Sequence, residues 1–361
     1  MKYKFSYILL LLVVFLSCKK SSKLQLKFVD EFIVEDSLVF KNTLVGGISG
    51  IDFAENQYYM VIDDASNPRV LVGNIKIQED KIKAVTFKKV ICLKDSMSSF
   101  YKDNALDLES VFVDDLERIN LVSEGRIYKG KDPSIFTIGK KGAFVEQVEI
   151  PNYFKANSEA KPKHNAAFES SSKSIDNKGF WVAMEAPLEA DGQEPTFHKT
   201  QSPIRITYFD NQTKKATRQF AYQLEKIDKP AKGKINLNGV TAILEYAKNK
   251  FFVVERIYQS GYGSLGNTVR VFKAEIDNKS TNTLDSQSLK KTGYTPLKKE
   301  LLFDFESVKS QLTDEIIDNI EGITFGPKLS NGNKSLILVS DDNFQVYGKQ
   351  LNQFILLEII E

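Results

Sequence analysis

The sequence predicts an all-β fold, a single β-propeller of five blades, with six blades as the alternative. Three observations support this prediction. A pair of short apolar strands recurs five times along the 361 residues, the second strand of each pair ends on an acidic residue, and further alternating apolar runs follow the pairs. Four short antiparallel strands per repeat are typical of one propeller blade. A recurrence of this kind indicates a repeat architecture.

The recurring pair is clearest near the C-terminal end, where 319–325 reads NIEGITF and 335–342 reads SLILVSDD. The five pairs occupy 47–53 with 58–64, 107–112 with 119–124, 165–169 with 179–185, 237–241 with 251–256, and 319–325 with 335–344. The first pair is followed by two more alternating runs, at 69–75 and 85–91. These runs complete its four strands.

The last pair has only one further strand after it, at 353–359, and the run at 24–33 has no blade of its own. We expect 24–33 to supply the missing outer strand, so that both termini close the ring and no open sheet edge remains. Residues 24–361 are then one propeller domain. The long insert at 277–318 is where a degenerate sixth blade would lie.

The predicted connections between strands are long and polar, and such loops are where sites are usually built. They lie at 94–104, 153–165, 189–202, 228–236 and 278–296. Residues 306–318 carry apolar side chains at helical spacing and predict a short helix before the last blade.

The N-terminal segment predicts an export signal. Residues 1–17 combine Lys2 and Lys4 with a short apolar run, and Cys18 follows. The run FLSC at 15–18 resembles the lipobox of bacterial lipoproteins, in which the cysteine becomes the lipidated first residue, and 18–23 then forms a tether. We expect a protein of the cell envelope that is held on a bacterial membrane by a lipid on Cys18. Ordinary secretion is the alternative.

Composition narrows the possible partners. The formal net charge is +2 with basic and acidic residues mixed, which gives no electrostatic case for nucleic acid. Cys92 is the only cysteine besides Cys18, so the mature chain has no disulfide once Cys18 is modified. With 42% hydrophobic residues, the chain can form a large core instead.

Polar residues recur at two equivalent places in the five strand pairs. Aligning the first strands gives the column Ser49, Glu109, Glu169, Asn238 and Glu321. Aligning the second strands gives the column Asp63, Glu124, Glu185, Glu255 and Asp341. In a propeller such positions converge on the axis, and crowded carboxylates then share protons or bind cations.

Oxygen ligands of this kind suit calcium, which takes about 6 to 8 of them. The metal candidates are therefore Glu109, Glu169, Asn238, Glu321, Asp63, Glu124, Glu185, Glu255 and Asp341. The alternative is structural, because acidic residues at equivalent blade positions also cap turns and accept backbone N–H groups. Zinc and copper are poorly supported, since His164 and His198 are the only histidines.

Other chemistry has weaker sequence support. Ser49 lacks the G-x-S-x-G spacing of a nucleophile elbow, because Ile51 stands where the second glycine is needed. His164 is a candidate base, with simple exposure to solvent as the alternative. Arg256, Arg126 and Lys129 follow acids of the second strands and would meet an anionic substrate or pair with those acids.

The repeated motifs also resemble a known family, the phytase-like proteins described as having esterase-like activity. The matching segments are 47–52 with 62–64, 107–109 with 122–124, 168–169 with 184–188, 254–256 with 261–271, and 319–323 with 339–344. Ser110 and Ser170 stand where the family commonly has a glycine after the glutamate. The resemblance implies a propeller and a hydrolase of phosphate or other esters.

Together these observations predict a lipid-anchored hydrolase that uses a carboxylate-bound divalent cation, Ca²⁺, at the propeller axis. Its substrate would be a small organic phosphate or other ester. The candidate catalytic residues are Glu109, Glu169, Glu321, Arg256 and His164. The alternative is a non-catalytic binding protein of the cell envelope with a structural calcium or no metal.

Overall fold

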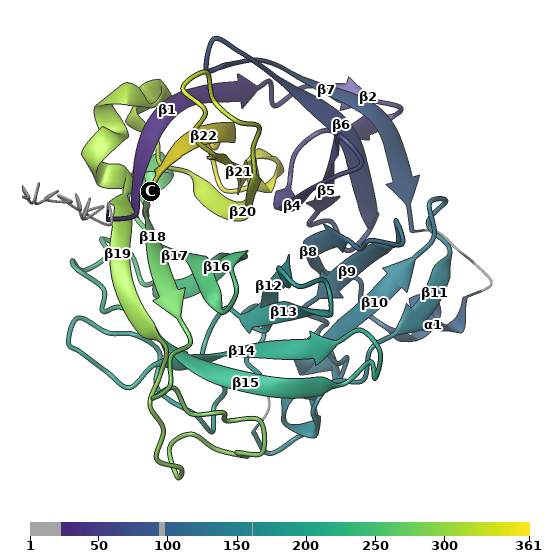
Figure 1. Cartoon of the computed structure of the whole chain (residues 1–361), viewed down its shortest axis with the longest axis vertical. Coiled ribbons are helices and arrows are strands. Elements are labelled where there is room, and N and C mark those ends of the chain that lie inside the picture. Colours follow the sequence, from purple (N-terminus) through teal and green to yellow (C-terminus); the bar gives the residue numbers. More distant parts are fainter. Residues whose placement is uncertain (1–22, 94–97, 161) are drawn as a thin grey trace, which may run out of the picture.

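A computed structural model describes residues 23–93, 98–160 and 162–361. The chain forms five four-stranded antiparallel sheets arranged as blades around a central axis (Figure 1). The first blade contains β4 (Ile48–Ala54), β5 (Gln57–Ile62), β6 (Arg69–Gln78) and β7 (Lys81–Cys92), and the second contains β8 (Leu108–Val113), β9 (Ile119–Ser123), β10 (Ser134–Ile138) and β11 (Phe144–Gln147). The third contains β12 (Phe168–Lys173), β13 (Gly179–Met184), β14 (Pro203–Asp210) and β15 (Ala216–Gln223), and the fourth contains β16 (Asn236–Ala247), β17 (Lys250–Gln259), β18 (Asn267–Glu275) and β19 (Lys298–Asp304). The fifth contains β20 (Asn319–Phe325), β21 (Ser335–Asp341), β22 (Asn352–Ile360) and β1 (Gln25–Val34). The predicted five-bladed propeller is confirmed.

The ring is closed by both ends of the chain, as the sequence predicts. β1 pairs antiparallel with β22, with Gln25 opposite Ile360 and Val34 opposite Asn352. The first strand of each blade, β4, β8, β12, β16 or β20, lies innermost and packs against the first strands of the two neighbouring blades. A short ribbon of β2 (Val39–Phe40) and β3 (Thr43–Leu44) leads into the first blade.

Apolar side chains fill the spaces between the sheets. Strand residues alternate between faces, so blades that are apolar on both sides bury both faces against their neighbours. Trp181 on β13 is fully buried and makes edge contacts with Tyr208 and Phe251. Four buried clusters of this kind surround the axis, and they hold the inner strands in fixed register.

The long insert forms no sixth blade. Residues 276–297 run along the outer edge of the third blade, where Thr283 N donates to Gln219 O at 2.8 Å and Leu297 N donates to Ala221 O at 2.8 Å. The insert therefore covers the edge of β15, which would otherwise be open. The helix predicted over 306–318 is instead two 3-10 helices, Phe305–Gln311 and Thr313–Glu315, and a short α-helix, α1 (Ser99–Asp103), lies within the predicted loop 94–104.

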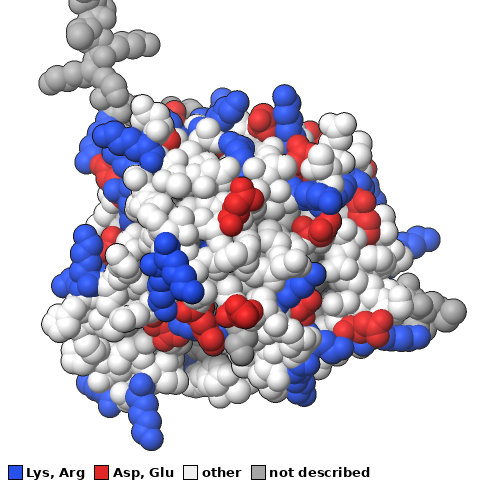
Figure 2. Space-filling model, turned by 90° about the horizontal axis from the view of Figure 1, so that it is seen from below, with Lys and Arg blue, Asp and Glu red and all other residues white. Residues whose placement is uncertain are grey.

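The predicted export signal at 1–17, the lipidation site Cys18 and all but the last residue of the 18–23 tether lie outside the described residues. Within the described part of the chain, no helix is long and apolar enough to span a membrane. Figure 2 shows the side of the ring, where Lys, Arg, Asp and Glu side chains are scattered among uncharged residues.

Candidate acidic centre at the propeller axis

A β-bulge near the start of every inner strand sets the first layer of the site. The pairing of the first two strands shifts by one residue at the same place in each blade, and the extra residues are Ser49, Glu109, Glu169, Thr241 and Glu321. A bulge redirects the side chain of its extra residue. Three blades thus present a glutamate to the centre and two present a hydroxyl.

The hydroxyls of this layer fasten neighbouring blades. Ser49 Oγ donates to Leu108 O at 2.8 Å, and Thr241 Oγ1 donates to Ile320 O at 2.7 Å. Each accepting carbonyl belongs to the residue just before the bulged glutamate of the next blade. The hydroxyls therefore support the backbone that carries Glu109 and Glu321.

A second layer follows the ends of the second strands. In each blade, the residue just before the bulge pairs with a residue of the second strand. The residues that follow these partners in the sequence are Asp63, Glu124, Glu185, Arg256 and Asp341. Four blades supply a carboxylate here, and the fourth blade supplies a guanidinium.

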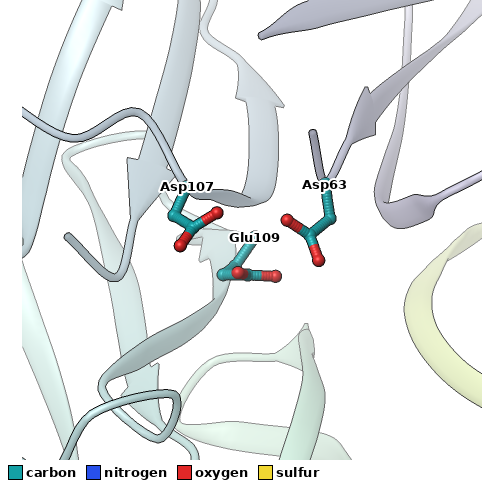
Figure 3. Close-up of side chains that lie close together, drawn as sticks. All are labelled: Asp63, Asp107 and Glu109. Carbon is teal, nitrogen blue, oxygen red and sulfur yellow. The ribbon is translucent and has the colours of Figure 1, made fainter. Parts of the chain in front are cut away.

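Carboxylates from different blades meet in two overlapping groups. Asp63, Asp107 and Glu109 offer oxygens that lie within 4.8 Å of one another, and so do Glu109, Glu169 and Glu321. Figure 3 shows the first group, in which Asp63 follows the end of β5 while Asp107 and Glu109 lie at the start of β8. Glu109 belongs to both groups and is the common member of the centre.

Two of the three glutamates of the centre, Glu109 and Glu169, are buried without a hydrogen-bond donor among the described residues. Each of the two is 7% exposed. Burial raises the pKa of Glu109 well above its usual range, and repulsion from Asp63 and Glu169 raises it further. Burial, followed by repulsion from Glu185 and Glu321, does the same to the pKa of Glu169.

The surrounding acids share this environment. Burial and the nearby Asp341 raise the pKa of Asp63 to about 8. Burial raises the pKa of Glu321 to about 8, although Arg256 acts in the opposite direction. Burial also raises the pKa values of Glu124, Glu185, Asp341 and Asp107.

Three basic groups lie next to these acids. Arg256 Nη2 is 3.3 Å from Glu185 Oε1 and 3.6 Å from Glu321 Oε1. Arg126, about one third exposed, places Nη2 3.8 Å from Asp107 Oδ2. His164 is exposed, lies with its ring 4.5 Å from that of Tyr128, and acts electrostatically on Asp107.

The donor set fits a hard divalent cation. Its ligands would be carboxylate oxygens, and Asn319 adds a neutral oxygen. Asn319 Nδ2 donates to Glu321 Oε1 at 2.8 Å, while the buried Oδ1 of Asn319 has no hydrogen-bond partner within residues 23–93, 98–160 and 162–361. Calcium binds carboxylate and amide oxygens of this kind. An orphaned amide oxygen beside buried, unsatisfied carboxylates is what a cation would complete.

Two residues that the sequence columns predict for the centre, Asn238 and Glu255, bind each other and other side chains instead. Glu255 accepts hydrogen bonds from Tyr222 Oη at 2.6 Å and Asn238 Nδ2 at 3.0 Å, and it pairs with Lys299. The alignment of the fourth blade was therefore wrong in both columns. The bulge makes Thr241 the equivalent of Glu109, and Arg256 the equivalent of Asp63.

Sequence reasoning missed Asp107 and Asn319, which occupy the same position two residues before a bulged glutamate. The recurring signal was an acid or amide, an apolar residue and then glutamate, in Asp107-Leu108-Glu109 and Asn319-Ile320-Glu321. Lys129, a candidate for anion binding, lies with its Nζ over the ring of Tyr128 instead.

A cleft among the described residues lies away from this centre. It has a volume of about 620 Å³ and opens on the flank of the third blade, between 152–160 and 287–292. Tyr153, Gln287 and Lys290 are among its lining residues, and none of the candidate site residues is.

Five blades around a buried acidic centre define a β-propeller protein whose axis carries an oxygen-donor site. The sequence pattern of a family described as "Phytase-like: Esterase-like activity of phytase" matches residues 43–344. The chain belongs to this family.

The other comparisons found distant similarities. No curated protein matches the sequence. An exo-beta-1,3-galactanase from Phanerochaete chrysosporium is 10% identical with a TM-score of 0.46, and the alignment covers 92% of this chain and 64% of that one. An endo-1,4-beta-xylanase from Bacteroides thetaiotaomicron is 9% identical with a TM-score of 0.43, over 86% and 90% of the two chains. The glutaminyl cyclase of Myxococcus xanthus is 9% identical with a TM-score of 0.39, over 93% and 97%. Scores this low carry no argument about activity.

Proposed function

We propose that the protein is a hydrolase of phosphate or other esters that holds a divalent cation, with Ca²⁺ as the first choice, in the acidic centre. The observation that carries this proposal is Glu109, a buried carboxylate that belongs to two groups of acids and receives no hydrogen bond from the part of the chain that the structure describes. Such a group needs a proton or a cation to be stable in the fold. Membership of the phytase-like family supports ester hydrolysis as the reaction class.

The residues that would hold the cation are Glu109 with Asp63 and Asp107, or with Glu169 and Glu321. The orphaned Oδ1 of Asn319 is a further ligand beside Glu321. A divalent cation in such a site supplies a Lewis acid that polarises a phosphoryl or acyl oxygen.

Residues of the chain would do the remaining work at the rim of the centre. Arg126, partly exposed beside Asp107, would bind the negative charge of a phosphoryl group. His164, which is exposed and close enough to Asp107 to act on it electrostatically, would take up or release a proton at a ring nitrogen. Arg256 holds Glu185 and Glu321 in place.

The lipid on Cys18 belongs to this proposal as well, with the protein attached to a bacterial membrane and acting on small organic phosphates or esters in the cell envelope. Mass spectrometry of the protein extracted from membranes tests it. A diacylated N-terminal cysteine is the expected result, and a soluble protein cleaved elsewhere would contradict it.

A calcium titration that follows thermal stability and hydrolysis of a generic phosphomonoester together tests the function. We expect calcium to raise both, and the Glu109→Gln/Glu321→Gln double variant to lose both responses. Arg118→Gln, which removes the partly exposed ion pairs with Asp114 and Glu146 at the far end of the second blade, is the control and should respond as the wild type does.

A non-catalytic binding protein is the second candidate, favoured by the 620 Å³ cleft that lies apart from the acidic centre. Its cation would only join blades. Stabilisation by calcium without turnover of any ester tested would support this reading over the first.

A further inference from the structure

One side of the acidic centre already contains a cation of its own. Arg256 occupies the position that the other four blades fill with carboxylates, because the bulge at Thr241 brings it one residue past Glu255. Its Nη2 lies 3.3 Å from Glu185 Oε1 and 3.6 Å from Glu321 Oε1. Burial lowers the pKa of Arg256, but Glu321 and Glu185 more than offset this effect and raise it.

The neighbouring backbone is shaped for this contact. Gly239 pairs directly with Arg256, and a Cβ atom at Gly239 would lie only 2.4 Å from Glu185 Cγ. The blades that carry Asp107 and Asn319 have a polar side chain at this position, whereas the fourth blade leaves the space to Glu185. The pairing of Glu185 with Arg256 therefore depends on a residue without a side chain.

The opposite side of the centre has no comparable cation. Asp63, Asp107 and Glu109 lie together, and the one basic group within 4 Å among the described residues is Arg126, at 3.8 Å from Asp107. Asp63 and Asp107 are only partly buried, so a cation from solvent can reach them. The charges of the two sides are thus balanced differently.

We propose that the guanidinium of Arg256 takes the place of a second metal ion. The protein then binds a single exchangeable divalent cation, at Asp63, Asp107 and Glu109, while Arg256 neutralises Glu185 and Glu321. The inference rests on the proposed cation site. The buried Oδ1 of Asn319, which has no partner among the described residues, lies beside Glu321, and Glu321 is close enough to Asp63 for the two carboxylates to repel each other, so this oxygen is an independent sign that the centre takes a cation. Arg256 is accordingly a residue that determines metal number.

Calorimetric titration of the metal-free protein with CaCl₂ tests this inference. The wild type should bind about one Ca²⁺ per chain, and Arg256→Gln about two, because Glu185, Glu169 and Glu321 then lack their internal cation and form a second oxygen-donor site. Arg256→Lys should keep a stoichiometry of about one. Arg126→Gln is the matched control, since it removes an arginine from the other side and should create no second site.

If metal-free Arg256→Gln fails to fold, the variant can be purified in CaCl₂, desalted and analysed for bound calcium, and two ions per chain are again expected. An unchanged stoichiometry in folded Arg256→Gln, or a wild type that binds two ions or none, would overturn the inference. These readouts do not depend on turnover. A protein that hydrolyses no ester but shows the change in stoichiometry would refute the proposed activity and leave this inference intact.

Discussion

Glu255 and Glu109 are both glutamates near the axis, and both are almost completely buried, yet their surroundings are opposite. Glu255 is 2% exposed and is held by Tyr222 Oη, Asn238 Nδ2 and the ammonium group of Lys299. Glu109 is 7% exposed and receives no hydrogen bond from the described residues. Two blades of the same design therefore treat the same side chain in two ways.

This difference in hydrogen bonding distinguishes acids with a structural role from acids that need a proton or a cation. A buried charge is tolerated when it is paired and hydrogen-bonded, and it is costly when it is not. The protein itself completes the environment of Glu255. Glu109 must obtain its proton or cation from solvent, which is why repeated acids at equivalent blade positions cannot all be given one role.

The largest expected effect tests the structural acid. Glu255→Ala deprives the buried Tyr222 Oη and Asn238 Nδ2 of their acceptor and leaves Lys299 only the more exposed carboxylate of Glu225. We therefore expect a loss of about 3–5 kcal/mol in the free energy of unfolding. Urea denaturation with calcium present measures it. Glu225→Gln is the control, because Glu225 meets the same lysine at the surface and should cost less than about 1 kcal/mol. Equal, small losses in both variants would contradict the distinction.

The second prediction concerns pH and the acidic centre. Asp63 and Glu321 have an ordinary pKa of 3.8 and 4.5, respectively, and in the folded protein both have a pKa of about 8. Folding therefore takes up protons between pH 5 and pH 8, so the stability they contribute is present below this window and is lost as the pH rises through it. We expect the metal-free protein to lose at least about 2 kcal/mol between these pH values.

Denaturation at several pH values, with and without calcium, checks this prediction. Calcium should flatten the profile, because a bound cation replaces the protons. A metal-free protein whose stability is constant or rises from pH 5 to pH 8 would show that the acids of the centre ionise freely.

A smaller effect is expected from removing the charge of Glu109 alone. Glu109→Gln keeps the shape of the side chain and abolishes repulsion with Asp63 and Glu169, so the metal-free protein at pH 8 should gain about 1–2 kcal/mol and lose its response to calcium. Glu245→Gln is the matched control. Glu245 is 3% exposed but accepts hydrogen bonds from Ile175 N and Asn249 N, so its substitution should destabilise the protein.

Much of the fold follows from local pattern. Alternating apolar runs separated by turns predict strands, and the strand at 24–33 that lacks a blade predicts the closure by β1 and β22. The count of five strand pairs gives the five blades. Residues 276–297 could not be placed from sequence, because their hydrogen bonds with the edge strand β15 join segments that lie far apart along the chain.

The sequence predicts the site residues correctly in the blades where an acidic residue occupies the bulge. It fails in the fourth blade, where the bulge carries a different type of residue. Glu109, Glu169 and Glu321 each occupy the bulge of the inner strand of their blade. Aligning the strand motifs by their glutamates therefore selects three residues that lie together in the fold. In the fourth blade the inner strand is longer, and the bulge lies at Thr241. Bulges depend on hydrogen bonds between strands, and matching one acid to another cannot reveal them.

The smallest effect we predict tests that register directly. Thr241 Oγ1 donates to Ile320 O, next to Glu321, and Thr241→Val removes this bond while preserving the shape of the side chain. We expect a loss of about 1 kcal/mol in the free energy of unfolding, because a buried carbonyl loses its donor. Thr241→Ser keeps the hydroxyl and should retain most of the stability.

Ser49 makes the corresponding hydrogen bond between the first and second blades, so Ser49→Ala should cost a similar amount through the loss of the donor to Leu108 O. If instead Thr241→Val were neutral while Asn238→Ala abolished the calcium response, Asn238 would be the member of the ring in the fourth blade.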